Sequence, residues 1–334
     1  MTQSFPRGGA MLPMRARLLL PAALLASPFA ARAQSDYPSR PVRWICPTSA
    51  GAGTDFAARA YAKLASDAWK QSVVVDNRSG ASGMIGLDMV ADAAPDGYTL
   101  GFFSVSQFLD ATLSNKYVFD AQKDFTPISL LASTPLLLMV NTGSKIESLQ
   151  QLLAQARAKP RAMNYASGGA GGITHFAMEV FLKRAGIEVT HVAYKGSGPA
   201  MMDLLSGQVQ MGFYTPAAVM PHVKSGKLRA LAIASAERSP ISPDVPTFAE
   251  LGISGVSIAT WYGLFGPAKM QPAQVEMIAR AIHAGARPTA MRDKMIGDGL
   301  EPVLSSPADF AKFLKADREQ WLGVAKSINF KRES

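Results

Sequence analysis

Short apolar segments alternate with longer amphipathic ones along most of this 334-residue chain, and this alternation restricts the folds open to it. Val42–Pro47 has the continuous apolar character of a buried strand. Asp55–Trp69 follows as a helix, with Phe56, Tyr61 and Leu64 at helical spacing. Because strands that alternate with helices build sheets covered by helices, the sequence predicts an α/β fold.

The same alternation continues to the C-terminus. Further strands are predicted at Val73–Asp76, Thr99–Ser104, Leu136–Asn141, Asn164–Ser167, Glu188–Ala193, Met211–Tyr214, Ala230–Ala234 and Val256–Leu264. Further helices are predicted at Ile85–Ala94, Leu149–Ala158, Thr174–Ala185, Pro199–Ser206, Ala217–Ser225, Pro272–Ala284 and Pro307–Ala325. The second α/β block is inserted between the first block and a helical C-terminal return, with crossings near 136–141 and 255–263. This layout fits a two-lobed clamp with a hinge, because so long a chain exceeds one compact core.

The N-terminus has the pattern of a secretory leader. Arg15 and Arg17 precede an apolar stretch from Leu18 to Ala31, and Ala31-Arg32-Ala33 has the form of a cleavage site. The apolar stretch is shorter than the roughly 20 residues that a membrane span needs. We therefore expect residues 1–33 to be removed on export to the periplasm, with Met1, Met11 or Met14 as the start.

Charge and cysteine content exclude several classes of protein. The formal net charge is +9, but the leader contributes four arginines and no acidic residue. The remaining excess is scattered, which argues against a nucleic-acid surface. Cys46 is the single cysteine, so no intramolecular disulfide forms, and its apolar surroundings indicate a core residue.

Four loops rich in glycine and small residues follow predicted strands and lead into predicted helices. Ligands of open α/β sheets bind at the edge where parallel strands end, and helix N-termini there offer free N–H groups to anions. Each loop alone is weak support, but four on one predicted sheet edge favour a ligand held by backbone N–H groups. The loops are residues 47–55, 77–86, 167–175 and 194–199.

Several side chains in these loops have two interpretations. Thr54 or Asp55 is expected to be the N-cap of the first helix, and Asp55 either only caps it or also contacts a ligand. Arg78 either pairs with a bound carboxylate or forms a structural salt bridge. His175 either donates to a ligand or only caps and packs, whereas His191 is expected to be structural.

The chemistry of the common enzyme classes is missing from the sequence. The four histidines, His175, His191, His222 and His283, form no i,i+4 pair and are remote from the cysteine, so no zinc motif is present. There is no G-x-S-x-G nucleophile elbow. The loop from Gly168 to His175 lacks the lysine of a phosphate-binding P-loop. We expect no catalytic residue, no metal and no cofactor.

An ordered series of motifs resembles the substrate-binding receptors of tripartite tricarboxylate transporters, also called the Bordetella uptake (Bug) family. The resemblance covers essentially the whole chain after the leader. The motifs are Tyr37–Pro41, Asp76–Arg78 with Gly80–Gly86, Pro95–Leu100, Asn164-Tyr165, His191–Ser197, Asp203–Val209, Gly226–Ala232, Ser239-Pro240, Asp244–Thr247 and Trp261–Gly263.

The resemblance implies a two-lobed periplasmic binding protein of type II, with a ligand cleft between the lobes. It implies one domain from residues 34–137 with 257–334, and a second from 138–256. It also implies a small carboxylate ligand that is handed to separate membrane permease subunits. The first wall of the site is expected to consist of Thr48, Ser49, Gly51, Gly53, Thr54 and Asp55. The facing wall is expected to consist of Ser167, Gly168, Gly169, Ala170, Gly171, Gly172, Ile173 and Thr174, with Lys195, Gly196, Ser197, Tyr214 and Trp261 as further candidates.

The sequence departs from the family pattern at positions that bear on the ligand. Thr48 and Ala52 replace an aromatic residue and a glycine, and Tyr214-Thr215 stands where many members have Asp-Asn. The site thereby loses a carboxylate suited to an amino group and gains apolar surface. We expect an aromatic or longer-chain carboxylate in preference to an amino acid. A sensor subunit that signals to a membrane kinase, or an exported enzyme, are the alternatives.

Overall fold

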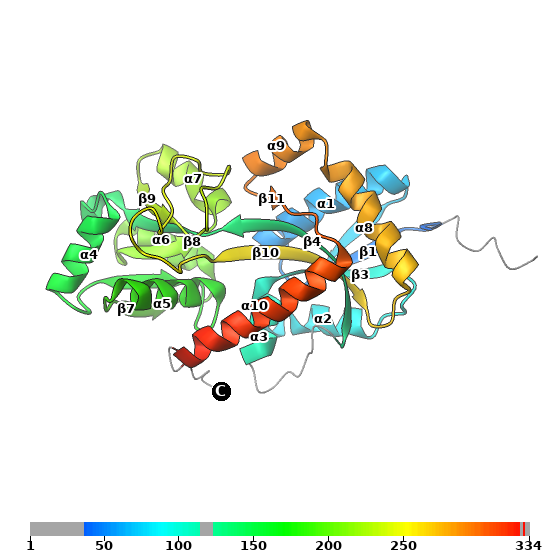
Figure 1. Cartoon of the computed structure of the whole chain (residues 1–334), viewed down its shortest axis with the longest axis horizontal. Coiled ribbons are helices and arrows are strands. Elements are labelled where there is room, and N and C mark those ends of the chain that lie inside the picture. Colours follow the sequence, from blue (N-terminus) through cyan, green and yellow to red (C-terminus); the bar gives the residue numbers. More distant parts are fainter. Residues whose placement is uncertain (1–36, 114–122, 328–329, 331–334) are drawn as a thin grey trace, which may run out of the picture. The chain divides into compact units, whose positions relative to one another are not determined.

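The computed structural model describes residues 37–113, 123–327 and 330 and contains two mixed β-sheets flanked by helices (Figure 1). This is the α/β architecture that the alternating pattern predicts. The predicted leader and its cleavage site, residues 1–33, lie outside the described residues. In the part of the chain that the structure describes, no helix combines the length and apolar character needed to cross a membrane.

The first sheet has six strands in the order β11-β4-β10-β3-β1-β2. Its parallel strands are β1 (Val42–Cys46), β2 (Val73–Asn77) and β3 (Thr99–Ser104), and its antiparallel members are β4 (Phe125–Pro135), β10 (Ala259–Pro267) and β11 (Glu301–Pro302). The accompanying helices are α1 (Gly53–Trp69), α2 (Met84–Ala91), α3 (Val105–Leu113), α8 (Pro272–Ala286), α9 (Thr289–Gly297) and α10 (Pro307–Ser327), with the 3₁₀ turn η1 (Ala81–Gly83). Helix α1 packs against α8, and α10 packs against α3 and β4.

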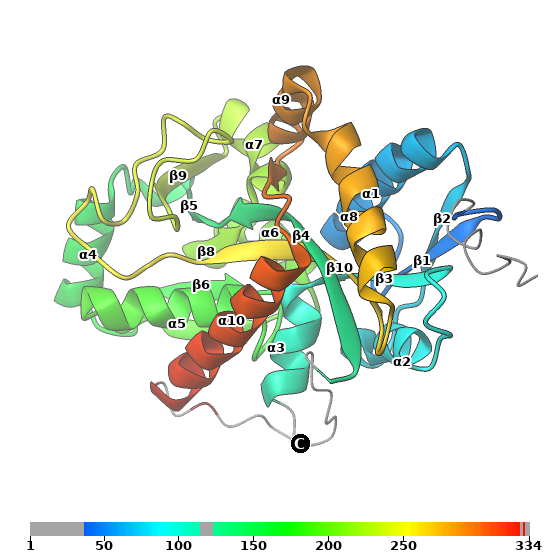
Figure 2. The ribbon, with the colours of Figure 1, turned by 45° about the vertical axis from the view of Figure 1, so that its right-hand side comes forward.

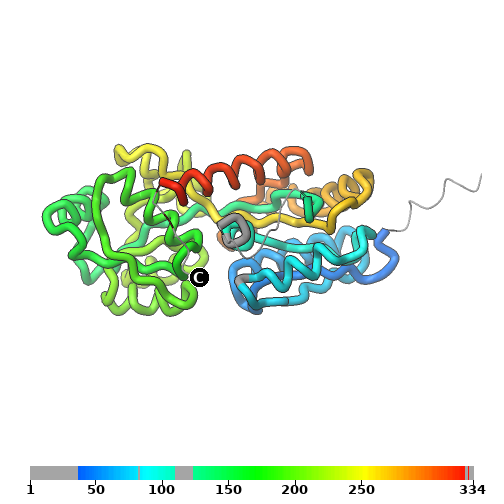
Figure 3. Tube along the Cα trace, turned by 90° about the horizontal axis from the view of Figure 1, so that it is seen from below, coloured from blue at the N-terminus to red at the C-terminus, as the bar shows by residue number. Residues whose placement is uncertain are grey.

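The second sheet has five strands in the order β7-β6-β8-β5-β9. They are β5 (Leu137–Asn141), β6 (Asn164–Ser167), β7 (Thr190–Ala193), β8 (Met211–Tyr214) and β9 (Leu228–Ile233), of which β6, β7 and β8 are parallel. The flanking helices are α4 (Leu149–Ala158), α5 (Ile173–Ala185), α6 (Ser197–Ser206) and α7 (Pro216–Lys224), with the 3₁₀ turn η2 (Thr142–Ser144). Figure 2 shows the green elements of this sheet beside β8, and Figure 3 shows the green segments of the chain grouped together.

Two connections join the sheets, and they run side by side. Leu136 links β4 to β5, and the segment 234–258 returns from β9 to β10. The amide of Leu136 donates to the carbonyl of Ile258 (3.2 Å), the amide of Ile258 to that of Ala234 (2.9 Å), and the amide of Ala234 to that of Leu136 (2.8 Å). These bonds tie the crossings together at the points the sequence indicates. Residues 38–334 form one compact unit, and the predicted boundaries between two domains stay a prediction.

Aromatic side chains form the densest part of the core beside the six-stranded sheet. Phe265 of β10 lies between Phe108 (4.9 Å between ring centroids) and Phe310 (5.0 Å), and Trp261 adds contacts to both phenylalanines. Such rings bury large apolar areas and dominate core energetics. The packing of Phe310 therefore fixes α10 against the sheet.

Most predicted elements are present, with three differences of substance. The strand predicted at Val256–Leu264 begins three residues later, at Ala259, and the helix predicted to reach Ala94 ends at Ala91, shortly before Pro95. Strand β4 and helices α3 and α9 were not among the predicted elements. Pro127 and Pro135 argue against a strand at β4 in the sequence, because proline usually interrupts a strand. In the structure, the pairing of β4 with β10 shifts register beside Pro127.

Candidate functional site

The four candidate loops all follow parallel strands, but they lie on two sheets instead of one. The loops after β1 and β2 border the six-stranded sheet, and those after β6 and β7 border the five-stranded sheet. The expectation of a single sheet edge was therefore wrong, because the chain's long α/β alternation is divided between two sheets. Each sheet has its own edge where parallel strands end and helices begin.

The first loop is held by Asp55, whose carboxylate is almost fully buried. It accepts hydrogen bonds from the amide of Gly51 (2.9 Å), the side-chain amide of Asn77 (2.9 Å) and the guanidinium of Arg59 (3.0 Å). Burial on its own raises the pKa of Asp55, but the bonds from Arg59, Gly51 and Asn77 outweigh it and lower the pKa below its usual value. The carboxylate is thus committed to positioning the loop.

Helix α1 begins two or three residues earlier than an N-cap at Thr54 or Asp55 would require. Its N-cap is Ala52, which offers no side-chain oxygen, and Asp55 lies in the first turn, where it bonds back to the loop. The predicted capping role was therefore wrong. The first amides of a helix have no intrahelical acceptor, so an uncapped start leaves the N–H groups of Gly53 and Thr54 available to an anion.

A polar group beside this loop was missed at the level of sequence. The hydroxyl of Thr54 lies 3.5 Å from that of Ser104, which donates to the side chain of Gln107 (2.9 Å). Tyr262 pairs with Ser104 across the strands, and its hydroxyl would lie 3.4 Å from a Cβ placed on Gly53. Burial raises the pKa of Tyr262 to about 12, so this hydroxyl stays neutral and able to donate. Ser104 ends the strand predicted at Thr99–Ser104, but only the parallel pairing of β3 with β1 brings it beside this loop.

The second wall is a loop whose backbone is bonded to its own side chains. Gly168 donates its amide to the Thr174 hydroxyl (3.0 Å), and Gly169 to the Ser167 hydroxyl (3.2 Å). Gly171 donates to Nδ1 of His175 (3.1 Å). Helix α5 then starts at Ile173 from the uncapped Gly172. The free donors of this wall are therefore first-turn amides of α5, since those of Gly168, Gly169 and Gly171 are engaged within the loop.

Two stacked histidines support this loop from behind. The rings of His175 and His191 are parallel and 4.1 Å apart, and Nε2 of His191 lies 2.7 Å from the Ser167 hydroxyl. Burial lowers the pKa of each to about 4, so both rings are neutral near pH 7. Nδ1 of His175 can then accept from the amide of Gly171, so this side chain supports the conformation of the loop. In the described part of the chain, no three His, Cys, Asp or Glu side chains are grouped for a metal ion.

The fourth loop joins the third. The amide of Gly196 donates to the carbonyl of Gly168 (3.0 Å), and a Cβ on Gly168 would lie 2.8 Å from the Ser197 hydroxyl. Lys195 is exposed beside them. The structure thus brings residues 167–174 and 195–197 together, as it does Thr48, Ser49, Gly51, Gly53, Thr54 and Asp55 around α1.

Tyr214 and Trp261 lie in cores. Tyr214 is 4% exposed, packs with Leu137, Ala200 and Leu204, and has a buried hydroxyl without a hydrogen-bond partner. Trp261 is 2% exposed, among the aromatic rings of β10 and α10. Strand alternation sends Trp261 to this core and its neighbour Tyr262 to the Gly53 side. The sequence does not distinguish the two because both faces of β10 are buried.

Arg78 and Cys46 have the structural surroundings that the sequence analysis allowed for them. Arg78 pairs with Asp76 (2.9 Å), which is also held by Arg43, so its salt bridge is structural. Cys46 is fully buried, and burial raises the pKa of its thiol. Neither contributes a reactive group to the loops.

Known proteins resemble this chain over nearly its whole described length. A family model described as "Tripartite tricarboxylate transporter family receptor" matches residues 57–330. Protein BugT of Bordetella pertussis is 36% identical over 297 residues, covering 88% of this chain and 91% of that protein.

Solved structures give the same result. Rpa4515 of R. palustris, with adipate, has a TM-score of 0.79 at 33% identity, covering 87% of this chain and 98% of that one. MatC from Rhodopseudomonas palustris, with bound malate, has a TM-score of 0.74 at 28% identity, covering 86% and 99%.

Proposed function

The chain belongs to the tripartite tricarboxylate transporter receptor family, and we propose that it captures a small carboxylate and delivers it to a membrane transporter of that type. Proteins with this family and fold are periplasmic solute-binding receptors and not enzymes. We further propose that the predicted leader, residues 1–33, takes this chain to the periplasm, and that permease subunits are its partners.

The start of α1 and the start of α5 carry this proposal. Both helices begin from residues without a side-chain oxygen, Ala52 and Gly172, directly after parallel strands. Uncapped first turns present N–H groups and a partial positive charge, which favour a carboxylate. In the proposed arrangement the two starts face each other across a cleft between two domains, and the ligand binds both when they close.

The first loop has no carboxylate free to bind an ammonium group, and this feature bears on the class of ligand. An amino acid needs a carboxylate for its ammonium group, and the oxygens of Asp55 are already bonded to Gly51, Asn77 and Arg59. We propose an aromatic or dicarboxylic acid in preference to an amino acid, with the neutral hydroxyl of Tyr262 as an additional donor. Two similar receptors hold dicarboxylates, adipate and malate.

A thermal-shift screen tests this function. The exported protein is melted with dicarboxylates, tricarboxylates, aromatic acids, and L-aspartate as the amino-acid reference. A ligand at 100 times its dissociation constant stabilises the folded state by about 2.7 kcal/mol, which is a clear rise in melting temperature. We expect the largest rise from an aromatic or dicarboxylic acid. No rise with any of these acids would sink the carboxylate proposal, and a largest rise with aspartate would sink the ligand class.

A matched pair of tyrosine variants locates the binding. Tyr262→Phe removes the hydroxyl near Gly53 and should reduce the ligand-induced rise. Tyr61→Phe removes a buried hydroxyl that donates to the carbonyl of Leu131 (2.7 Å), remote from the loops. It should lower the melting temperature without ligand but leave the ligand-induced rise unchanged. Equal rises in both variants would remove Tyr262 from the site.

A further inference from the structure

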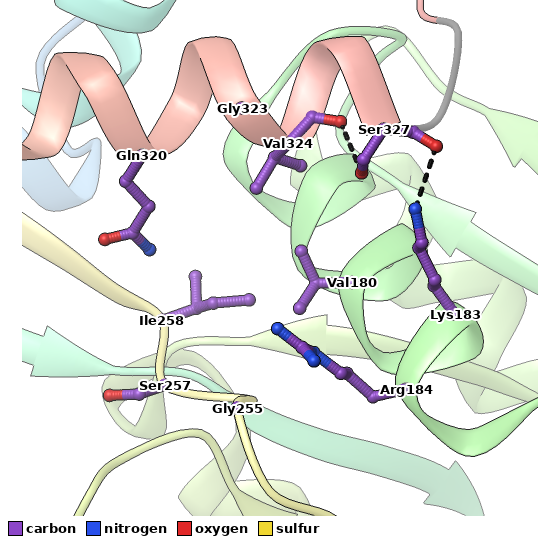
Figure 4. A pocket seen from close by; sticks show the side chains of 10 residues that line it. All are labelled: Val180, Lys183, Arg184, Gly255, Ser257, Ile258, Gln320, Gly323, Val324 and Ser327. Carbon is purple, nitrogen blue, oxygen red and sulfur yellow. Dashed lines mark hydrogen bonds between the residues drawn. The ribbon is translucent and has the colours of Figure 1, made fainter.

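A pocket of about 770 Å³ lies away from the four candidate loops, between the last turns of α5 and α10 and the segment that returns to β10 (Figure 4). Its volume is within the range of pockets that hold small molecules. Helix α5 contributes Val180, Lys183 and Arg184, and the return segment contributes Gly255, Ser257 and Ile258. Helix α10 contributes Gln320, Gly323, Val324 and Ser327.

Among the residues that the structure describes, the pocket lining carries positive charge and no acidic side chain. Two of its lining residues, Lys183 and Arg184, are cationic, and none is acidic. Lys183 donates to the carbonyl of Ser327 (3.1 Å) at the end of α10. The guanidinium of Arg184 has neither a hydrogen-bond nor an ion-pair partner among the described residues. Its planar set of donors therefore remains available for a carboxylate or phosphate group.

The exposed guanidinium of Arg184 lies against the backbone of the return segment. Gly255 adopts φ +80°, and a Cβ at this position would lie 3.0 Å from Cζ and Nε of Arg184. Glycine at this position therefore lets the guanidinium approach the chain without being displaced. Figure 4 shows Arg184 directed toward Ser257 and Ile258, with Gln320 reaching down from α10 on the opposite side. A cation, an amide and a hydroxyl thus border one space.

The remaining wall is apolar. Val180, Ile258 and Val324 come from the three different segments and line the same pocket. A ligand that satisfies the whole pocket combines an anionic group for Arg184 with a short apolar part for these side chains. We propose that this pocket is a second binding site, separate from the candidate loops, for a small organic anion of this kind.

An NMR titration tests the site directly. The full chain is isotopically labelled, exported and purified, and its amide signals are followed as phenylphosphonate is added, with inorganic phosphate in parallel. We expect saturable shifts at Arg184, Gly255, Ser257 and Gln320, with phenylphosphonate binding more tightly because of its ring. Shifts confined to the loops 51–54 and 168–174, or no saturable shift at the pocket, would overturn the assignment.

Exposed variants separate this site from general charge effects. Arg184→Gln should weaken phenylphosphonate binding at the pocket by about tenfold or more, since it removes a charged hydrogen-bonding partner. Gln320→Ala should weaken it less. Arg229→Gln makes the same charge change on β9, outside the pocket lining, and should leave the affinity unchanged. Equal affinities of Arg184→Gln and Arg229→Gln would contradict the proposal.

Discussion

At the scale of single residues, Asp55 determines the geometry of the first candidate loop. Replacement by asparagine keeps one acceptor oxygen but places a donor against Asn77 or Arg59, so a buried bond is lost. We expect Asp55→Asn to lower the free energy of unfolding by about 2 kcal/mol in urea denaturation at pH 7. Asp67→Asn, on the exposed side of the same helix, breaks only the pair with Lys63 and should cost less than about 0.5 kcal/mol.

His175 makes the stability of the second loop depend on pH. Its pKa is depressed to about 4 in the fold, so its contribution is complete above the unfolded value, about 6.5, and is lost as the pH falls toward 4. We expect the wild type to lose about 2 kcal/mol of unfolding free energy through this group between pH 7 and pH 4. His175→Asn retains an acceptor for Gly171 but does not titrate, so its urea stability should fall less steeply. Parallel pH profiles for the two proteins would disprove the role of His175.

Asp317 has the opposite pH dependence. Burial raises its pKa to about 6, despite the lowering effects of the nearby indole N–H groups of Trp261 and Trp321, of which Trp321 Nε1 donates a hydrogen bond of 3.0 Å. The neutral acid is therefore favoured in the fold. The stability it contributes is complete below the unfolded pKa, about 3.9, and is lost as the pH rises through 6.

Asp317→Asn is uncharged at every pH and still offers an oxygen to Trp321. We expect this variant to be more stable than the wild type by about 1–2 kcal/mol at pH 7.5 in urea denaturation. The gain should disappear near pH 4, where the wild-type carboxyl is also neutral. A variant that is less stable at pH 7.5 would show that the carboxylate is required.

At the scale of elements, the loop before α5 depends on the backbone conformation of Gly171. Gly171 has φ +81°, and a Cβ there would lie 2.9 Å from the ring of Phe330. We expect Gly171→Ala to destabilise the protein by about 1–2 kcal/mol in thermal or urea unfolding. Gly172→Ala is the matched control, because Gly172 has φ −77° and only a carbonyl 3.4 Å away, and it should cost less than about 0.5 kcal/mol. Similar losses in both variants would contradict this assignment.

How far the sequence predicts these elements depends on whether local signals decide them. Helix α4 and strand β6 occur at their predicted bounds, and α5 ends at Gly186 as predicted, because periodicity and end signals agree there. Strand β4 was missed because Pro127 and Pro135 argue against it locally, whereas the pairing of nine of its residues with β10, two of them also with β11, holds it in place. The formation of β4 is therefore decided by tertiary pairing, which no local sequence pattern contains.

The candidate site likewise has one part that local sequence predicts and another that only folding brings together. The loops 48–55 and 167–174 follow from glycine content at the ends of predicted strands. The support behind them does not, because the Gly171–His175 bond, the His175–His191 stack and the Thr54–Ser104 contact join segments by folding. The choice of Trp261 over Tyr262 likewise depended on which face of β10 points toward Gly53.

At the scale of the whole molecule, the two sheets are joined by adjacent connections that bond to each other through Leu136, Ala234 and Ile258. In the two-domain arrangement that we propose, these residues would form the hinge about which the domains close. We therefore predict that one ligand is captured reversibly between the starts of α1 and α5. We expect capture to leave the ligand chemically unchanged, because proteins with this family and fold are solute-binding receptors and not enzymes.

Calorimetric titration of the exported protein is the most direct test of this claim. Adipate, an aromatic acid and L-aspartate are titrated separately, and each compound is recovered afterwards and identified. The account predicts tight, one-to-one binding of a dicarboxylic or aromatic acid, weaker binding of aspartate, and recovery of the acid intact. Preferential binding of aspartate would contradict the assigned ligand class, and conversion of the bound acid into a product would contradict the receptor function itself.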